Sequence, residues 1–503
     1  MRELLLGGAC GAVYFLGYAG WGLWPLALLW PVPLLWGLQR LNNAPGALRL
    51  GLGFGTVAHL GGYDFLYGTL RQFSGFGPLP CLLLYAGICV VQGGQLALFT
   101  WLSFWLRSRG RDPVVLAALC YGAVERIYPL LFPSYLAAAL YQQPIALQVV
   151  ELGGPTLLSM AMVASGAAVY AALRAATGGP QRRRFVLGVA VAAMGVVAYG
   201  GVRMARVQAR AQQAETLRVG VVQANMGLIE KRTDWREGRR RHMEMSRDLE
   251  RRVRPDLLVW PETAIATPIA QGVKDVSPLL GSLATPVLFG ALTHGSEGAR
   301  GHLYNSAVLA DVDGKVLGRV DKQHLLAFAE YMPLGEQLPA LYALSPHSGA
   351  LTAGEHNRPL PLGPYRLTAL ICYEDILPGF VRDAVRRGEP HLLVNLTNDA
   401  WFGRSGEPEI HLALATLRAV EHRRYLVRAT NSGISAVIDP LGRVVVRTGL
   451  FERATLDAEV AMLQGLTPFA RLGDWPGWGA LVLTLLLGLR GRSPAVANAG
   501  RQK

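Results

Sequence analysis

A glutamate, a lysine and a cysteine in the second half of the chain combine the side chains that nucleophilic catalysis needs. Glu262 occurs in the segment WPET, Lys322 in DKQH and Cys372 in ICYED. A carboxylate can take the proton of a thiol, and a nearby ammonium group lowers the thiol pKa and can stabilise an oxyanion. The three residues therefore favour a reaction in which the Cys372 thiolate attacks a substrate.

Each of these residues also has a structural interpretation. Cys372 could be a small, buried hydrophobic side chain, and its position alone does not decide between the two interpretations. Only five of the 49 basic residues are lysines, so Lys322 suggests a need for a compact point charge, although genome composition could explain the same scarcity. The other four cysteines lie in apolar segments, which leaves Cys372 without a disulfide partner in its own part of the chain: Cys10, Cys81, Cys89 and Cys120.

Each candidate lies at the end of a predicted strand or just after it. Apolar runs predict strands at 256–260 before Glu262, at 315–320 before Lys322 and at 366–372, which ends on Cys372. Side chains at strand ends lie at the edge of a sheet, where nucleophiles are often presented. The strand-end positions therefore favour a functional role for the three side chains.

The rest of the segment 216–464 alternates strand and helix patterns. This alternation with fully apolar strands predicts a layered α/β domain whose sheets are covered by helices. The further predicted strands are 217–224, 285–292, 303–310 and 391–396, the helices are 237–254, 377–387 and 410–428, and a hairpin joins 433–438 to 443–447.

The charge distribution excludes the function that the net charge first suggests. The 503 residues carry a formal net charge of +14, which is typical of a nucleic-acid-binding protein. However, 216–464 is almost neutral, with 29 Lys+Arg and 28 Asp+Glu, so nearly the whole basic excess belongs to the apolar remainder. We therefore expect no nucleic-acid partner.

The apolar remainder predicts membrane spans. A span needs about 20 predominantly apolar residues, and eight segments meet this description. We expect spans at 3–19, 21–38, 48–69, 80–106, 113–132, 155–175, 185–203 and 474–490. The second and the eighth are short and rich in Trp and Pro, and could instead lie at the membrane interface.

The short loops between these spans predict an orientation. Short cytoplasmic loops are enriched in Lys and Arg. Arg71 is the only basic residue in the opposite short loops, whereas fourteen lie on the side that holds both termini: Arg2, Arg40, Arg49, Arg107, Arg109, Arg111, Arg174, Arg182, Arg183, Arg184, Arg490, Arg492, Arg501 and Lys503. Both termini are therefore predicted in the cytoplasm and 204–473 on the far side of the membrane.

Ionisable residues inside the predicted spans raise the alternative of a transporter. His59, Asp64, Glu125 and Arg126 lie within apolar segments, where such residues often serve transport. A Glu125–Arg126 pair, or snorkelling near a span end, explains two of them more simply. The spans alone therefore do not identify a transporter.

Three segments together resemble a known superfamily. WPET, DKQHLLAFAEYMP and ICYEDILP, in this order and spacing, resemble the catalytic blocks of the nitrilase (carbon–nitrogen hydrolase) superfamily. With the membrane spans around them, the whole chain resembles the apolipoprotein N-acyltransferase family of bacterial inner membranes. The middle block departs from the family pattern at Ala327 and Ala329, where Pro and Gly are common, so the conformation of this loop stays open.

The resemblance implies a fold and an organisation. It implies an α/β nitrilase-like αββα sandwich domain inserted in an all-α polytopic membrane domain of about eight transmembrane helices. The implied parts are a membrane domain at 1–204, a periplasmic catalytic domain at 216–464, an eighth helix at 474–490 and a cytoplasmic tail at 491–503. The implied location is the bacterial inner membrane.

The resemblance also implies roles for single residues. It makes Glu262 the general base, Lys322 the oxyanion stabiliser and Cys372 the nucleophile. Glu330 matches a second glutamate that supports this triad. Four further residues match positions that shape or line the site: Tyr373, Glu374, Asn305 and Trp235, the last in a loop after the first strand. Trp235 could instead be a packed loop aromatic, and Asn305 a turn or capping residue.

The implied reaction is a two-step acyl transfer without a cofactor or a metal ion. A phospholipid donates its acyl chain to Cys372, and the N-terminal amine of a diacylglyceryl apolipoprotein then accepts it. Because both partners are lipid-anchored, we expect apolar loops over the site, with Leu325, Leu326, Phe328 and 338–344 as candidates. These residues could equally be domain core.

Two other functions remain open at this stage. A membrane-tethered nitrilase-type amidase or hydrolase would use the same three residues but would pass the acyl group to water. A transporter or receptor with an inactive outer domain would have no need of the intact triad.

Overall fold

The computed structural model describes residues 1–174, 179–295, 302–327, 329–332, 334–335, 337–338, 349 and 351–490. The predicted cytoplasmic tail at 491–503 lies outside these residues. The contacts between residues divide the chain into two compact units. The first consists of Met1–Asp64, Leu82–Arg203 and Leu472–Lys503, and the second of Phe65–Cys81 and Met204–Arg471.

The first unit is helical, and helices occur in all eight predicted spans. Three of them are long and apolar enough to cross a membrane, namely α6, α9 and α10, while Leu26–Gln39 and Trp475–Leu489 are shorter apolar helices. A count of eight transmembrane helices therefore stays a prediction. The helices are α1 (Arg2–Leu16), α2 (Leu26–Leu29), α3 (Pro31–Gln39), α4 (Ala44–Gly62), α6 (Pro78–Ser108), α7 (Pro113–Ile127), η1 (Leu136–Leu140), α8 (Pro144–Leu147), α9 (Val150–Leu173), α10 (Pro180–Gln213) and α17 (Trp475–Leu489).

The expected ion pair between Glu125 and Arg126 is wrong. Glu125 Oε1 accepts a hydrogen bond from the backbone N–H of Leu136 at 3.2 Å. Arg126 instead lies 3.7 Å from Asp474 and stacks over the ring of Trp478. Neighbouring residues on a helix point to different sides, so the two charges find separate partners.

The second unit contains two sheets. The first has the order β13-β1-β2-β4-β5-β6, with β3 paired to β4. Strands β1, β2 and β4 are parallel, and β5 and β6 continue the sheet antiparallel. The strands are β1 (Thr216–Gln223), β2 (Leu257–Val259), β3 (Ile265–Ala270), β4 (Val287–His294), β5 (Leu303–Ala310), β6 (Val316–Asp321) and β13 (Ala454–Ala461).

The second sheet has the order β12-β11-β10-β9-β8-β7. Its central strands β8, β9 and β10 are parallel. The strands are β7 (Leu360–Leu362), β8 (Tyr365–Ile371), β9 (Leu392–Thr397), β10 (Tyr425–Thr430), β11 (Ala436–Ile438) and β12 (Val444–Arg447).

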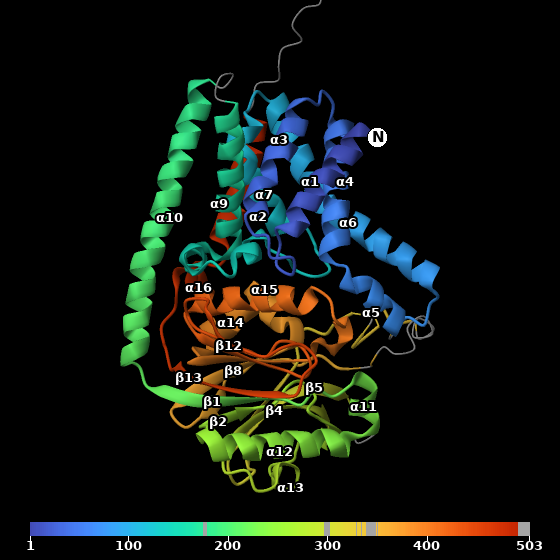
Figure 1. Cartoon of the computed structure of the whole chain (residues 1–503), viewed down its shortest axis with the longest axis vertical. Coiled ribbons are helices and arrows are strands. Elements are labelled where there is room, and N and C mark those ends of the chain that lie inside the picture. The colour runs from blue at the N-terminus through green and yellow to red at the C-terminus, as the bar shows by residue number, and fades with distance from the viewer. Residues whose placement is uncertain are drawn as a thin grey trace, which may run out of the picture. The chain divides into compact units, whose positions relative to one another are not determined.

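Alternation along the strands builds four layers. Leu257 and Val259 of β2 point into the core between the sheets, whereas Leu258 packs on the outer side with Met243 and Leu249 of α12 (Trp235–Val253). The second sheet packs its outer face against α14 (Pro378–Gly388) and α15 (Glu407–His422). Figure 1 shows α12 below the first sheet and α14 and α15 above the second. The predicted αββα sandwich is confirmed.

The predicted helix at 410–428 is wrong at its C-terminal end. Helix α15 stops at His422 because Arg423 adopts a left-handed conformation, with φ of +53°. The chain then enters β10, which pairs with β9 in parallel and with β11. Sheet pairing of Leu426 and Val427, both buried, outweighs the helical pattern of the sequence there. The short strands β3 and β7 and the edge strand β13 were not predicted.

Candidate active site

The ends of three strands bring the predicted catalytic residues to one place. Glu262 follows β2, Lys322 follows β6 and Cys372 follows β8. Strands β2 and β6 both run parallel to β4, directly and through β5 respectively, so their carboxyl ends lie at the same edge of the first sheet. Lys322 lies 3.4 Å from Glu262, measured from Nζ to Oε1.

Glu330 completes the surroundings of Lys322. Its carboxylate lies 2.8 Å from Lys322 Nζ, and its Oε2 accepts a hydrogen bond from the backbone N–H of Leu326 at 2.8 Å. The ammonium group, which is almost fully buried, therefore stands between two carboxylates. A buried charge needs such partners, and the two carboxylates hold the Lys322 side chain in a fixed direction.

Asn305 links the two carboxylates. Its Nδ2 donates to Glu262 Oε1 at 2.6 Å and to Glu330 Oε1 at 3.2 Å. Asn305 lies in β5, and its backbone carbonyl accepts from the N–H of Lys322 at 2.8 Å. Asn305 therefore contacts Glu262, Glu330 and the backbone of Lys322, and its role in the site stays a prediction.

Cys372 begins the turn η4 (Cys372–Ile376) in a left-handed conformation with φ of +55°. Non-glycine residues adopt this conformation rarely, and it occurs often at functional sites. Asn395 Nδ2 donates to the Cys372 carbonyl at 2.9 Å and thereby fixes the backbone of the turn. The cysteine thus stands at a sharp corner between a strand and a turn, as its position in the sequence predicts.

The charges at the site shift the pKa of each group. Burial, together with the negative charge of Glu262, raises the pKa of the Cys372 thiol well above its ordinary value, and Lys322 opposes this rise. Burial also raises the pKa of Glu262, against the opposing charge of Lys322. Burial works against the charge of Lys322, but Cys372, Glu330 and Glu262 raise its pKa well above the ordinary value. The thiol therefore rests protonated beside a carboxylate that can accept its proton.

Glu374 joins the cysteine turn to the lysine loop. Its Oε1 accepts from the backbone N–H groups of Gln323 and His324 at 2.7 and 3.1 Å, and its Oε2 accepts from Ile371 at 2.8 Å. Burial raises the pKa of Glu374 to about 7, although these N–H donors oppose the rise. Through these hydrogen bonds the Glu374 carboxyl group connects the segments that carry Lys322 and Cys372.

Tyr373 lies over the same lysine. Its hydroxyl donates to the carbonyl of Leu325 at 3.2 Å, and its ring lies 5.7 Å from Lys322 Nζ. An ammonium group is attracted to the face of an aromatic ring within about 6 Å. Tyr373 therefore borders the site on the side of the lysine loop.

Two families match the chain in separate regions. The family described as carbon-nitrogen hydrolase matches residues 218–465, which include all the contacts above, and the family described as apolipoprotein N-acyltransferase N-terminal domain matches residues 10–168. The apolipoprotein N-acyltransferase of Azotobacter vinelandii is 34% identical over 96% of this chain and 93% of its own length. The enzyme of the same name from Pseudomonas putida is 31% identical over 96% of this chain and 95% of its own length.

The chain belongs to the apolipoprotein N-acyltransferase family. Among solved structures, Saccharomyces cerevisiae Nit3, a member of branch 10 of the nitrilase superfamily, is similar to 49% of this chain and 90% of its own, with 17% identity and a TM-score of 0.39. The two family matches and the relatives from Azotobacter vinelandii and Pseudomonas putida confirm the family resemblance inferred from the sequence.

Trp235 is the predicted site residue for which the structure gives only local contacts. It lies at the first position of α12 rather than in a loop, after α11 (Leu228–Thr233), and Asp234 caps the helix. Its ring is half-buried and packs beneath the guanidinium of Arg236 at 4.8 Å. Among the residues described, none of the triad contacts it, so its place in the site stays a prediction.

Lys231 is a site residue that sequence reasoning missed. Its Nζ donates to the Glu262 carbonyl at 2.7 Å and to Thr263 Oγ1 at 2.9 Å, and the side chain is buried. Burial lowers the pKa of Lys231 to about 8, against the charge of Glu262. It holds the backbone of the general-base candidate. The scarcity of lysine, used for Lys322, would have singled it out as well.

The predicted apolar loops are described only in part. Leu325 and Leu326 are half-buried next to the site, and Leu338 is exposed. Phe328 and 339–344 lie outside the described residues. The prediction of a cover over the site therefore stays a prediction.

One buried cluster combines side chains that often bind metal ions, but its neighbours do not favour a cation. Asp399, Glu407 and His411 offer ligand atoms within 4.8 Å of one another. Both ring nitrogens of His411 already face carboxylates, and the Arg428 guanidinium lies 3.7 Å from Asp399. A divalent cation would compete with His411 and Arg428 for the same carboxylates, so the cluster does not fit a metal ion.

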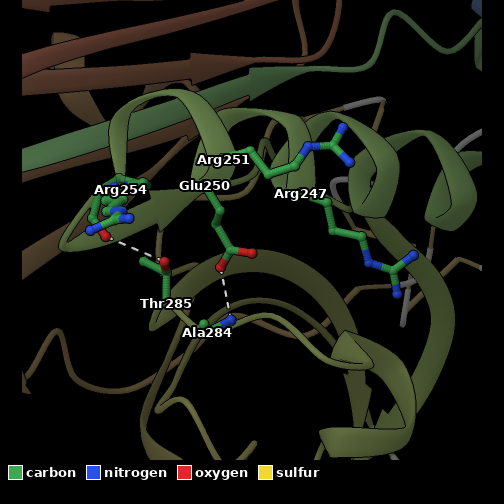
Figure 2. A pocket seen from close by; sticks show the side chains of 7 residues that line it. Arg247, Glu250, Arg251, Arg254, Ala284 and Thr285 are labelled. Carbon is green, nitrogen blue, oxygen red and sulfur yellow. Dashed lines mark hydrogen bonds between the residues drawn. The ribbon is translucent and has the colours of Figure 1, made fainter.

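A cavity of about 580 Å³ lies at the amino ends of β2 and β4, away from the strand ends that carry the triad. Figure 2 shows Glu250 accepting a hydrogen bond from the backbone N–H of Ala284. The side chains of Arg247 and Arg251 extend away from this hydrogen bond. The lining residues are Arg247, Glu250, Arg251, Arg254, Pro255, Ala284 and Thr285. None of them is a predicted site residue, so this cavity is not assigned to the chemistry.

Proposed function

We propose that this protein transfers a fatty acyl chain from a membrane phospholipid to the α-amino group of the diacylglyceryl-modified N-terminal cysteine of lipoproteins. Its membership of the apolipoprotein N-acyltransferase family supports this acceptor. The observation that carries the mechanism is the buried group formed by Glu262 and Lys322, 3.4 Å apart at one edge of the first sheet, and by Cys372 at the end of β8 in the second sheet. Its alternative, a hydrolase, would need the same group.

The first step forms a thioester and releases a lysophospholipid. Glu262 takes the thiol proton of Cys372 as the sulfur attacks the ester carbonyl, and the carbonyl oxygen becomes an oxyanion beside Lys322. The bond from carbon to the glycerol oxygen then breaks. Glu262 returns the proton to that oxygen, so the enzyme keeps the acyl group and no net charge is made or lost.

In the second step the amine nitrogen is the nucleophile and the Cys372 sulfur is the leaving group at the same carbonyl carbon. The neutral amine of the lipoprotein cysteine attacks the thioester carbonyl, and Glu262 accepts a proton from this nitrogen. The bond from carbon to sulfur breaks, and the proton passes to Cys372. An amide is released and the enzyme returns to its starting state.

The raised pKa of Glu262 fits a group that exchanges a proton in both steps. A general acid–base group works best when its pKa lies near the ambient pH. Burial raises the pKa of this carboxyl from its ordinary value toward that range. Lys322 keeps its positive charge because its pKa is raised, so it can face an oxyanion in both steps.

The membrane helices supply the physical reason for combining this site with an apolar unit. Exposing one buried CH₂ to water costs about 0.8 kcal/mol, so a long acyl chain costs on the order of 10 kcal/mol to extract. A site held at the bilayer surface avoids this cost for both lipid substrates. We further propose that the protein resides in the bacterial inner membrane, with the catalytic unit in the periplasm and both termini in the cytoplasm.

An incubation of the purified enzyme tests the proposal. It contains a phospholipid labelled in its acyl chain and a synthetic diacylglyceryl peptide. We expect the label in an N-acyl peptide, with lysophospholipid formed in equal amount. Labelled free fatty acid without N-acyl peptide would support the alternative, a membrane-tethered nitrilase-type hydrolase. Cys372→Ser serves as the control for spontaneous transfer.

A further inference from the structure

A group of charged side chains lies buried directly behind the cysteine turn. It consists of Asp375, Asp399, Glu407, His411 and Arg428, all of them buried. None of these residues has a role in the reaction steps above. Burying charges is costly unless they are paired, so this group needs an explanation beyond ordinary packing.

His411 bridges two carboxylates that belong to different turns. Its Nε2 lies 2.8 Å from Asp375 Oδ1 and its Nδ1 lies 3.2 Å from Asp399 Oδ1. A neutral imidazole has only one N–H donor, whereas an imidazolium has two. Because both ionised carboxylates can only accept, the geometry requires the charged form of His411.

The electrostatics agree with this geometry. Burial and the charge of Arg428 oppose a positive His411, but Asp375 and Asp399 raise its pKa to about 10. Burial, together with Asp399, raises the pKa of Glu407 well above its ordinary value. Asp375 and Asp399 face both His411 and Arg428.

Arg428 makes a second bridge between the same two carboxylates. Its Nη1 donates to Asp375 Oδ2, and its Nη2 lies 3.7 Å from Asp399 Oδ2. Arg428 belongs to β10, and His411 to α15. The two aspartates are thus held together by cations from two separate elements.

The two bridged aspartates belong to the turns that surround the nucleophile. Asp375 lies in η4, which begins with Cys372, and Asp399 begins the turn η5 (Asp399–Phe402), separated from the end of β9 by one residue. We infer that His411 is a positioning residue, which as an imidazolium joins these two turns and sets the place of Cys372 against Lys322. Only the expected effect of His411 on the rate of acyl-enzyme formation rests on the proposed function.

The consequence for chemistry follows from the distances at the site. Lys322 stabilises the thiolate of Cys372, and this stabilisation falls as the distance between the charges grows. Loosening η4 would therefore raise the pKa of the cysteine and misplace the attacking sulfur. A displacement of about 1 Å can slow an enzyme about 100-fold.

His411→Gln in the full-length enzyme tests the inference. The introduced amide can donate to only one aspartate and turns its oxygen toward the other. We expect the rate of acyl-enzyme formation to fall about 10- to 100-fold, and the pH profile of Cys372 alkylation by iodoacetamide to move about half a unit or more to higher pH.

His422→Gln is the matched control. His422 is an equally buried imidazole on the same helix, and its ring packs against Phe469 rather than against η4 or η5. If both variants lose thermal stability to a similar degree, only His411→Gln should move the alkylation profile. A profile that moves equally in both variants would mean that the helix, and not the bridge, matters.

The double variant His411→Gln with Asp399→Asn provides the rescue. It removes one positive and one negative charge, and the two amides can hydrogen-bond to each other while the glutamine donates to Asp375. We expect alkylation and acyl-enzyme formation to recover most of their loss relative to His411→Gln alone. An unchanged alkylation profile in His411→Gln would overturn the inference.

The alkylation readout also separates the two proposals. It needs no lipid substrate, so it reports on the position of Cys372 even if the acyl transfer proposed above is wrong. A wild-type enzyme that forms no acyl-enzyme, together with a shifted profile in His411→Gln, would contradict the proposed function but support the bridge.

Discussion

Lys322 is the residue on which the geometry of the site converges. It is nearly inaccessible to solvent, two carboxylates contact its ammonium group, and the ring of Tyr373 covers it. Such an environment maintains one fully charged group in a fixed position, which is the property that an oxyanion requires. Asn305 and Glu330 contribute by holding this arrangement.

Replacing Lys322 with methionine should therefore abolish most of the activity. Methionine has a similar length but no charge, so the oxyanion loses its partner and Glu262 and Glu330 lose their counter-charge. We expect acyl-enzyme formation to slow about 100- to 1000-fold, measured in a single turnover by mass spectrometry. Lys315→Met, at an exposed lysine of the same domain, should leave the rate within about twofold.

Glu374→Gln should remove part of the pH dependence of stability. Because burial raises the folded-state pKa of Glu374 to about 7 from the usual 4.5, the folded state holds a proton that the unfolded state releases between these values. The free energy of unfolding of the wild type therefore falls as pH rises from about 4.5 to 7. The glutamine variant lacks this contribution.

Denaturant unfolding at several pH values measures this effect. The stability difference between the wild type and Glu374→Gln should shift in favour of the variant as pH rises through this window. Glu355→Gln, at an exposed position, should show no such change. A difference that is constant over the window would rule out a raised pKa for Glu374.

At the residue scale, the sequence pointed to the candidate catalytic groups more readily than to the residues that hold them. Cys372, Glu262 and Lys322 could be predicted because they combine reactive side chains with strand ends. Lys231, Asn395 and the His411 bridge contact the site through backbone carbonyls or through residues distant in sequence. Such contacts exist only once the helices and turns have packed against the sheet to which they belong.

At the scale of elements, a close approach between two strands fixes the position of Glu262. Gly290 of β4 lies against the residues that follow β2: a Cβ there would lie 2.5 Å from the Thr263 nitrogen and 2.6 Å from Glu262 Cα. Only glycine permits this distance. The close contact between the backbones of β4 and of the segment after β2 therefore fixes the position of Glu262.

Gly290→Ala should displace this segment. We expect the free energy of unfolding to fall by about 1–3 kcal/mol, and acyl-enzyme formation to slow more than the stability loss explains. Thermal unfolding and single-turnover kinetics measure the two effects. Gly272→Ala, where a Cβ meets nothing within 4 Å, is the control, and equal effects of the two substitutions would contradict the role given to Gly290.

The elements with strong periodicity were predicted well, and those defined by pairing were not. Strands β1, β5 and β9 and helices α12 and α14 match their sequence patterns within about two residues. The short β3 and β7 and the edge strand β13 owe their structure to hydrogen bonds with neighbouring strands. The same holds for β10, where sheet pairing overrides a helical pattern.

At the scale of the whole molecule, the distribution of basic residues predicts the orientation in the membrane. The basic excess lies outside 216–464 and gathers at loops on one predicted side. The five cysteines are all buried, so a cysteine introduced at an exposed position can be labelled against a low background. This makes the proposed orientation directly measurable.

Val312→Cys and Asn42→Cys should differ in their access to a membrane-impermeant maleimide. Both positions are exposed, one in the catalytic unit and the other in a predicted cytoplasmic loop. In cells with a permeabilised outer membrane, we expect Val312→Cys to be labelled and Asn42→Cys to be labelled only after lysis. The reverse pattern would contradict the proposed orientation.

The proposed mechanism depends above all on Cys372, which carries the acyl group between donor and acceptor. The most direct test is the intact mass of the purified protein after exposure to a single phospholipid, without acceptor. We expect a mass increase of one fatty acyl group on Cys372, which hydroxylamine or the diacylglyceryl peptide removes and which is absent in Cys372→Ala. An N-acyl peptide formed at the wild-type rate by Cys372→Ala would contradict it.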